Sequence, residues 1–168
     1  VMGEAVFHTK CSIKVGEDEY GYNKAIIATG SSPRMIEVEG LDEADTLTNQ
    51  NIFELKDVPE KLLIIGSGPI GMEMAQAFSM LGSDVTIASI DSRFARLEDT
   101  AISPIIEKKC KDLGITIHLN AFISRVENGE AIFDRKEGEE VVGETKVPFD
   151  KVLIAIGRVP NLPQGLSA

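Results

Sequence analysis

The chain has 168 residues, of which 43% are hydrophobic and 26% charged, and its formal net charge is −10. This size and composition fit one well-cored globular domain, with or without pieces of a neighbouring domain, and exclude a disordered tail. The acidic balance, without clusters of Lys or Arg, argues against a nucleic acid or an anionic membrane surface as partner. No apolar run approaches the roughly 18 residues of a membrane-spanning helix.

The N-terminal part of the chain predicts short strands without helices. Residues 5–8 and 12–15 carry β-branched or aromatic side chains, and residues 16–19 predict a polar turn. The continuous apolar run at residues 24–28 predicts a strand buried on both faces, which ends abruptly at residues 29–33. Because no helical pattern accompanies these strands, we expect them to belong to an incomplete domain.

After a polar connector at residues 34–60, the pattern becomes that of an α/β protein. Residues 62–65 predict a buried strand, residues 66–71 a glycine-rich turn, and residues 72–81 a helix that ends at Gly82. On this helix, Gly71 and Ala75 form a surface of small residues that favours close packing. Ile70, Met74 and Phe78 form an apolar stripe.

The alternation then continues. Residues 85–90 predict the next buried strand, residues 100–113 a second helix that ends at Gly114, and residues 115–119 a third strand. The apolar stripe of the second helix consists of Ile102, Ile106, Cys110 and Leu113. The order βαβαβ is typical of a mononucleotide-binding half of a Rossmann-like parallel sheet.

Residues 121–149 interrupt the alternation. The runs 122–127 and 130–134 meet at Asn128-Gly129, a dipeptide that favours a type I′ hairpin turn. A third run, 141–149, follows a charged turn around Gly138. We expect an antiparallel three-stranded meander laid on the parallel sheet, which gives an α/β fold with three layers.

The chain then returns to the sheet. Residues 151–157 predict a last buried strand, whereas residues 158–168 contain two prolines and no packing pattern. We therefore expect this tail to be cut from a continuing chain.

The glycine-rich turn predicts a dinucleotide-binding site, because a strand precedes it, a helix follows it and a second strand ends about 20 residues later. Gly66 allows the tight turn, Gly68 lets the backbone approach a pyrophosphate, and Gly71 permits close packing of helix on strand. A phosphate would be bound by free N–H groups at the helix start, where Pro69 is well tolerated. The candidate residues of this turn are Gly66, Ser67, Gly68, Pro69, Ile70 and Gly71. A turn that merely packs a helix tightly is the structural alternative.

The end of the second strand is where such sites distinguish NAD from NADP, with an acid for the ribose 2′-OH or an arginine for the 2′-phosphate. That position falls near Ser89, which is neither. Asp91 could accept a hydrogen bond from the ribose, and Arg93 and Arg96 could meet a 2′-phosphate. A solvated loop explains these three charges equally well. The sequence therefore leaves both NAD and NADP open.

Three motifs, in this order, give the chain a family resemblance. Residues 28–33 read ATGSSP, residues 66–73 read GSGPIGME, and residues 155–161 read AIGRVPN. Together they resemble the pyridine nucleotide–disulfide oxidoreductase family, to which dihydrolipoamide dehydrogenase, glutathione reductase and mercuric reductase belong. Residues 48–53 and 74–78 most resemble mercuric reductase and dihydrolipoamide dehydrogenase.

The resemblance implies three parts. Residues 1–33 would be remnant strands of an FAD-binding domain, residues 34–157 an NAD(P)-binding domain, and residues 158–168 a truncated re-entry into the FAD domain. By the same resemblance, five residues outside the glycine turn would contribute to cofactor binding: Thr29, Gly30, Ala155, Gly157 and Arg158.

The resemblance also assigns a role to Glu73. We expect this residue in the first helical turn, where the helix dipole favours an acid. The family match implies that it approaches the nicotinamide and flavin rings and pairs with a lysine of the FAD domain, which is not in this chain. Pro69 stands where glutathione reductases often carry an aromatic gate, so we expect no gate. Arg96 matches the second arginine of NADPH-using members, whereas Ile90 replaces the first.

Several family features do not occur in the sequence. These are the FAD-binding GxGxxG, the redox CxxxxC pair and the dimerisation domain with its His-Glu pair. Cys11 and Cys110 have neither redox-pair nor metal-ligand spacing, so we expect no metal site, a buried core thiol at Cys110 and a reducing cytoplasm. His8 and His118 lie in strand patterns, and we interpret both as structural.

The sequence thus predicts the NAD(P)H-binding part of an FAD-dependent enzyme that delivers hydride to the flavin and then to a disulfide or related substrate. We expect the chain alone to be inactive and its parent, with FAD and dimerisation domains, to be a homodimer. Two alternatives are a non-catalytic nucleotide-binding module and a ferredoxin- or rubredoxin-type NAD(P)H reductase without the cysteine pair. The sequence upstream of this chain would distinguish them.

Overall fold

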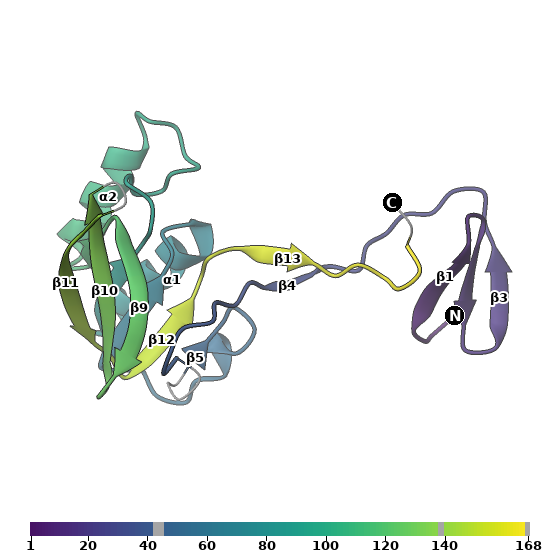
Figure 1. Ribbon diagram of the computed structural model, residues 1–168, viewed down its shortest axis with the longest axis horizontal. Helices are drawn as coiled ribbons and strands as arrows, with labels where there is room; N and C mark the ends of the chain where they lie inside the picture. Colours follow the sequence, from purple (N-terminus) through teal and green to yellow (C-terminus); the bar gives the residue numbers. More distant parts are fainter. Residues whose placement is uncertain (42–45, 138–139, 167–168) are drawn as a thin grey trace. The chain divides into compact units, whose positions relative to one another are not determined.

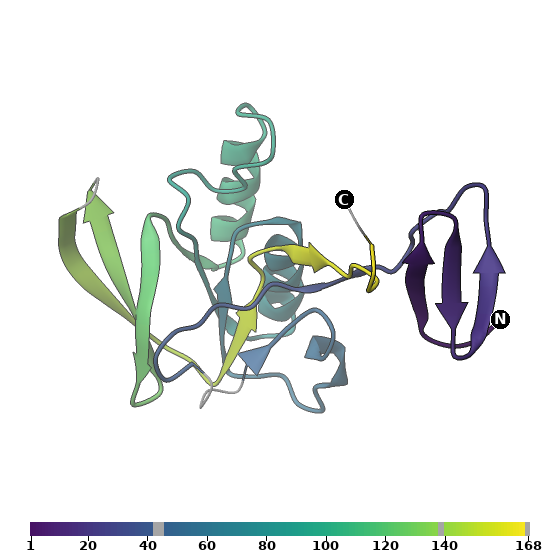
Figure 2. The same ribbon diagram turned by 45° about the vertical axis from the view of Figure 1, so that its right-hand side comes forward.

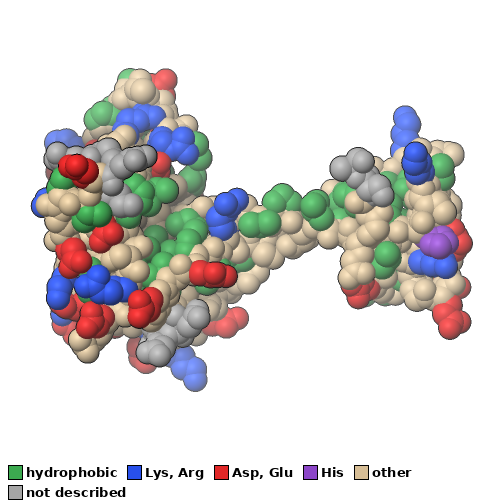
Figure 3. All heavy atoms as spheres, viewed as in Figure 1, with side chains coloured by type: hydrophobic (Ala, Val, Ile, Leu, Met, Phe, Trp, Pro, Cys, Tyr) green, Lys and Arg blue, Asp and Glu red, His purple; other side chains and the backbone are tan. Residues whose placement is uncertain are grey.

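The computed structural model describes residues 1–41, 46–137 and 140–166. It divides into two compact units. The smaller unit consists of Val1–Ser32 together with Arg158–Ala168, and the larger unit is Pro33–Gly157. No helix in the described ranges is long and apolar enough to cross a membrane. On the face of the larger unit shown in Figure 3, cationic and anionic side chains are interspersed.

A parallel five-stranded sheet forms the centre of the larger unit (Figure 1). Every neighbouring pair of its strands is parallel, in the order β5-β12-β6-β7-β8. The strands are β5 (Thr46–Leu47), β6 (Lys61–Ile65), β7 (Asp84–Ala88), β8 (Thr116–His118) and β12 (Lys151–Ile154). The chain therefore runs outward from β6 to β8 and returns on the other side of β6, as a Rossmann-like sheet does.

Helices cover one face of this sheet, in agreement with the predicted βαβαβ order (Figure 2). They are α1 (Pro69–Met80), α2 (Ser103–Asp112) and the short 3-10 helix η1 (Ile52–Glu54). Leu62 and Ile64 of β6 share one hydrophobic cluster with Ala75 and Phe78 of α1. The alternate β6 residues belong to a second cluster, so β6 is buried on both faces and reads as a continuous apolar run.

The predicted meander covers the opposite face. Its strands are β9 (Ala121–Glu127), β10 (Glu130–Glu137) and β11 (Glu140–Pro148), paired antiparallel in the order β11-β10-β9. Phe133 and Val147 from the meander pack with Leu63 and Ile65 of β6. The hairpin turn has φ of 54° at Asn128 and 76° at Gly129, as a type I′ turn requires. The three-layer α/β fold is thereby confirmed. The predicted turn at Gly138 lies outside the described residues.

The smaller unit contains two sheets. β1 (Ala5–Thr9), β2 (Ser12–Val15) and β3 (Asp18–Gly21) form an antiparallel sheet in chain order. β4 (Ser31–Pro33) pairs with β13 (Arg158–Pro160), although more than 120 residues separate them in the chain.

Two predictions for the smaller unit were wrong. Residues 24–28 form no strand and are exposed, with Ile26 96% exposed. No strand in the described part of the chain pairs with this run, and an apolar strand is stabilised only between neighbours. Residues 18 and 19 belong to β3 rather than to a turn, because Val15 pairs with Asp18 directly after Gly16 turns at φ 62°. The start of the tail forms β13, a strand that the sequence did not predict.

Both helices begin elsewhere than predicted. α1 begins three residues early, at Pro69, because a proline is suited to the first helical turn. α2 begins later, at Ser103, since the Asp99 side chain accepts a hydrogen bond from the Ala101 N–H (2.7 Å) and holds a turn before the helix. Two members of the predicted α2 stripe flank the helix rather than belong to it: Ile102 and Leu113 are 46% and 40% exposed.

The cysteines differ in environment, and this difference can be measured. Cys11 is exposed, whereas Cys110 is buried, and burial raises the pKa of the Cys110 thiol with a smaller contribution from the Glu107 carboxylate. Because the thiolate is the reactive form, we expect a maleimide at neutral pH to label Cys11 rapidly and Cys110 only after unfolding. The Cys11→Ser variant should lose the rapid phase. Rapid labelling of that variant would contradict the burial of Cys110.

Candidate functional site

A cavity of about 650 Å³ opens in the larger unit at the carboxyl edge of the parallel sheet. The segments that follow three neighbouring strands line it: residues 66–70 after β6, residues 89–91 after β7 and residues 155–157 after β12. β6 and β12 are adjacent, although β7 and β8, which follow β6 in the chain, lie on the other side of β6, so the strand order reverses at this point. Ligands of open α/β sheets bind in the crevice at such a switch point.

Two glycines of the turn are required by close backbone packing. Gly66 has φ of 113°, donates its N–H to the Ala88 carbonyl (2.8 Å), and has no room for a Cβ beside the Ala155 carbonyl. A Cβ on Gly71 would overlap the Gly66 carbonyl. Turn, helix and neighbouring strand are therefore in backbone contact here, which is the role predicted for these glycines.

Gly68 is different, because nothing in the protein requires a glycine there. Its φ of −79° is available to any residue, and an added Cβ would meet no atom within 4 Å. This Cβ would instead point into open space where Gly68 lines the cavity, at the N-cap of α1. The first N–H groups of a helix have no intrahelical acceptor and attract anions. The arrangement fits a phosphate group that lies against Gly68.

The residue at the predicted ribose-reading position has a structural role as well. Ser89 is buried, accepts a hydrogen bond from the Ser67 hydroxyl (3.1 Å), and donates one to the Asp91 carboxylate (3.3 Å). The glycine turn and the loop after β7 are thereby connected through side chains. Asp91 is held at the edge of the cavity.

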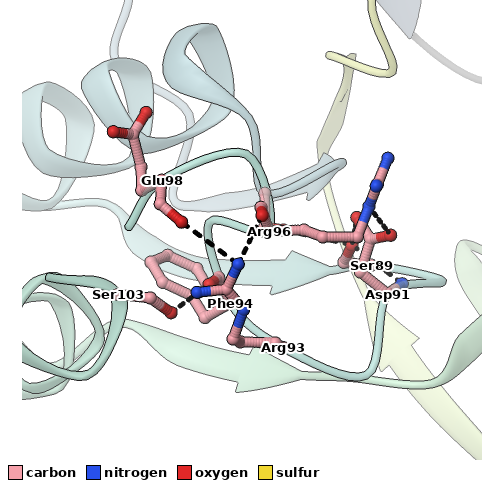
Figure 4. Close-up of polar contacts among 8 residues, drawn as sticks. Ser89, Asp91, Arg93, Phe94, Arg96, Glu98 and Ser103 are labelled. Atoms are coloured by element: carbon pink, nitrogen blue, oxygen red, sulfur yellow. Dashed lines mark hydrogen bonds and ion pairs between the residues drawn. The ribbon is translucent and has the colours of Figure 1, made fainter. Parts of the chain in front are cut away.

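The charged loop after β7 places its two arginines in different environments (Figure 4). Arg96 lines the cavity, and its Nε lies 2.7 Å from an Asp91 carboxylate oxygen, with 62% of its side chain exposed. Arg93 is not among the lining residues, and its Nη2 donates to the backbone carbonyls of Arg96 (2.5 Å) and Glu98 (3.1 Å). One anion and one cation therefore face each other at the edge of the cavity.

The structure brings most of the predicted site residues of the larger unit together. Those that line the cavity are Gly66, Ser67, Gly68, Pro69, Ile70, Ser89, Asp91, Arg96, Ala155 and Gly157. Gly71, Glu73 and Arg93 lie outside the lining. Glu73 is exposed on α1 and stands beyond the first helical turn, contrary to the prediction, because the helix begins at Pro69.

The remaining predicted residues lie in the β4–β13 ribbon of the smaller unit. The Arg158 guanidinium donates to the hydroxyl of Ser31 (2.7 Å) and to its carbonyl. Asn161 donates its backbone N–H to the Gly30 carbonyl (3.0 Å) and its side-chain amide to the Thr29 carbonyl (3.2 Å). The first and third sequence motifs therefore form one hydrogen-bonded ribbon.

Sequence reasoning missed two groups of cavity residues. They come from the connector, Arg34, Ile36, Glu37 and Val38, and from the start of β9, Ala121, Phe122 and Ile123. A bridge between Glu39 and Arg125, with a hydrogen bond from the Val126 N–H to the Glu39 carbonyl (2.8 Å), brings the connector to the meander. The connector has no periodic pattern from which this contact could be read.

Comparison with known proteins agrees with this geometry. Residues 1–166 match the family described as pyridine nucleotide-disulphide oxidoreductase. The chain belongs to this family.

Its relatives include a mercuric reductase of Lysinibacillus sphaericus, 36% identical over 96% of this chain and 29% of the relative. A dihydrolipoyl dehydrogenase of Mycoplasma genitalium is 34% identical over 96% of this chain and 35% of the relative. Among solved structures, the HOCl-induced flavoprotein disulfide reductase RclA from Escherichia coli superposes with a TM-score of 0.76 at 29% identity, covering 95% of this chain and 36% of that one. The chain thus spans about a third of the length of these relatives.

The three glycines predict different stability effects. Gly66→Ala and Gly71→Ala each force a Cβ onto a backbone carbonyl, so we expect each to lower the free energy of unfolding by about 2 kcal/mol or more. Gly68→Ala meets open space at an ordinary φ, and we expect a loss of at most about 1 kcal/mol, because alanine is a poorer N-cap. Urea unfolding of the three variants measures these values. Equal losses at all three positions would contradict the assigned packing.

Proposed function

We propose that this chain is the NAD(P)H-binding domain of a flavin-dependent oxidoreductase. The observation that carries the proposal is Gly68, a glycine at a helix N-cap that the protein's own packing does not require and that faces the cavity. A pyrophosphate against this backbone would be bound by the N–H groups of the first turn of α1. The family membership supports the same conclusion.

The rest of the cavity suits the two nucleoside ends of such a ligand. Its lining is mainly apolar, with a small number of charged groups, as is common for cofactor sites. Asp91 and Arg96 would face the adenosine ribose, and Ile156 and Gly157, after β12, line the cavity where β12 lies beside β6. By the family match, Glu73 is proposed to approach the nicotinamide ring. A bound NADH or NADPH supplies a hydride, which the FAD of the parent enzyme accepts.

The smaller unit is proposed to belong to the FAD-binding part of the parent protein. Thr29, Gly30 and Arg158 would contribute to that site from the β4–β13 ribbon. The relatives are a mercuric reductase, a dihydrolipoyl dehydrogenase and a disulfide reductase, so a disulfide or a related acceptor is the proposed substrate class. The parent would be a cytoplasmic homodimer, and the 168-residue chain, which lacks a CxxxxC pair, would not reduce a disulfide alone.

Titration calorimetry tests the proposal. We expect the chain to bind NADH, NADPH or both at millimolar ligand or below, and not to retain FAD. Gly68→Val should abolish dinucleotide binding while the domain stays folded, because the branched side chain fills the space against the N-cap. Circular dichroism provides the control for folding. Unchanged affinity in a folded Gly68→Val variant would show that the phosphates bind elsewhere.

The ion pair between Asp91 and Arg96 sets a second expectation. Arg96→Ala removes a charge-assisted contact to a 2′-phosphate, worth roughly 1.5–3 kcal/mol. The variant should therefore lose about tenfold or more in affinity for NADPH relative to its affinity for NADH. Asp91→Ala should lower the affinity for NADH and leave the affinity for NADPH equal or higher, because it removes a carboxylate that repels the phosphate. Four titrations give the two affinity ratios. If neither substitution changes its ratio, the ribose does not lie at this ion pair.

A further inference from the structure

Hydrogen bonds from the Arg93 side chain hold the loop that carries Arg96. The Nη2 of Arg93 donates to the carbonyls of Arg96 (2.5 Å) and Glu98 (3.1 Å), so one guanidinium joins the two ends of the segment 96–98 (Figure 4). Phe94 is fully buried in the core, and Ala95 has the left-handed φ of 49°. A chain segment of this shape, with a non-glycine residue at positive φ, is stable only where its surroundings hold it.

The same contacts turn Arg93 away from a ligand. Its Nη1 is enclosed by protein, without a hydrogen-bond partner among the described residues, and Arg93 does not line the cavity. Arg96, whose side chain is 62% exposed and whose Nε lies 2.7 Å from an Asp91 carboxylate oxygen, does line it. Two arginines that the sequence offers together as candidates for a 2′-phosphate therefore differ in what they can reach.

We propose that Arg93 is a positioning residue, which holds the segment 94–98 so that Arg96 lies at Asp91, and that Arg96 alone meets a 2′-phosphate. This inference rests on the proposed binding of NAD(P)H and specifies which residues determine the preference between the two nucleotides. Lysine cannot replace Arg93, because its ammonium lacks the planar fork that donates to two carbonyls in fixed directions.

The experiment combines a double-mutant cycle with a measurement that needs no nucleotide. The variants are Arg93→Met, Arg93→Lys, Arg96→Ala and the double variant Arg93→Met/Arg96→Ala. Lys109→Met serves as the matched control, since it removes one exposed positive charge from α2. Hydrogen exchange of the amides at residues 94–98 reports on whether the hydrogen bonds of Arg93 hold this segment. Calorimetry at one ionic strength gives the NADPH/NADH affinity ratio.

If Arg93 acts through Arg96, both Arg93 variants accelerate exchange at residues 94–98, whereas Arg96→Ala and Lys109→Met do not. Arg93→Met and Arg93→Lys then lower the NADPH/NADH affinity ratio by about fivefold or more, toward that of Arg96→Ala. In the Arg96→Ala background, Arg93→Met changes the ratio by less than about twofold, because no positioned guanidinium remains to be lost.

Other outcomes overturn the inference in recognisable ways. If the effects of Arg93→Met and Arg96→Ala on the ratio multiply in the double variant, and Arg93→Lys retains the wild-type ratio, Arg93 binds the phosphate itself. Unchanged exchange at residues 94–98 in the Arg93 variants shows that Arg93 does not hold this segment. If the wild-type chain binds neither nucleotide, the proposed function fails, and the assignment of Arg96 to a 2′-phosphate fails with it. Normal wild-type binding with an unchanged ratio in the Arg93 variants refutes the positioning role alone.

Discussion

The contact between the glycine turn and the neighbouring strand is the constraint on which the site depends. At Gly66 the backbone lies against the Ala155 carbonyl, and at Gly71 the helix lies against Gly66, so side chains are excluded at both contacts. Three backbone segments thereby meet at the carboxyl edge of the sheet. The end of the cavity at the start of α1 is built from main-chain atoms, whose positions depend on the sheet rather than on flexible side chains.

A second set of contacts extends from this turn to the loop after β7. Ser67, Ser89, Asp91 and Arg96 are linked in sequence by two hydrogen bonds and an ion pair. The two hydrogen bonds hold Asp91 at the edge of the cavity, and the ion pair with Arg96 balances the charge of its carboxylate. If NAD(P)H binds as proposed, the preference between a ribose hydroxyl and a phosphate would depend on how this pair responds to the ligand, and hence on how firmly the loop holds Arg96.

Much of the fold follows from local chemistry in the sequence. Residues 62–65 of β6 are apolar throughout because both faces of the strand are covered. The Asn128-Gly129 turn demands positive φ at both positions, and the glycine turn requires backbone contacts that only glycine permits. In each case the residue type predicts the local backbone conformation or the burial. The run at residues 24–28 has the same apolar character, yet it is exposed, because burial of a strand depends on neighbours as well as on composition.

By itself, the sequence determined the βαβαβ unit, the meander, the position of the glycine turn and the membership of the family, since each depends on short-range pattern and residue type. Tertiary structure alone decided which charges face the cavity. Arg93 and Arg96 are identical side chains three residues apart, and only the left-handed bend at Ala95 and the burial of Phe94 turn one toward backbone carbonyls and the other toward Asp91. The connector residues enter the cavity for the same reason: a bridge to β9, distant in sequence, brings them there.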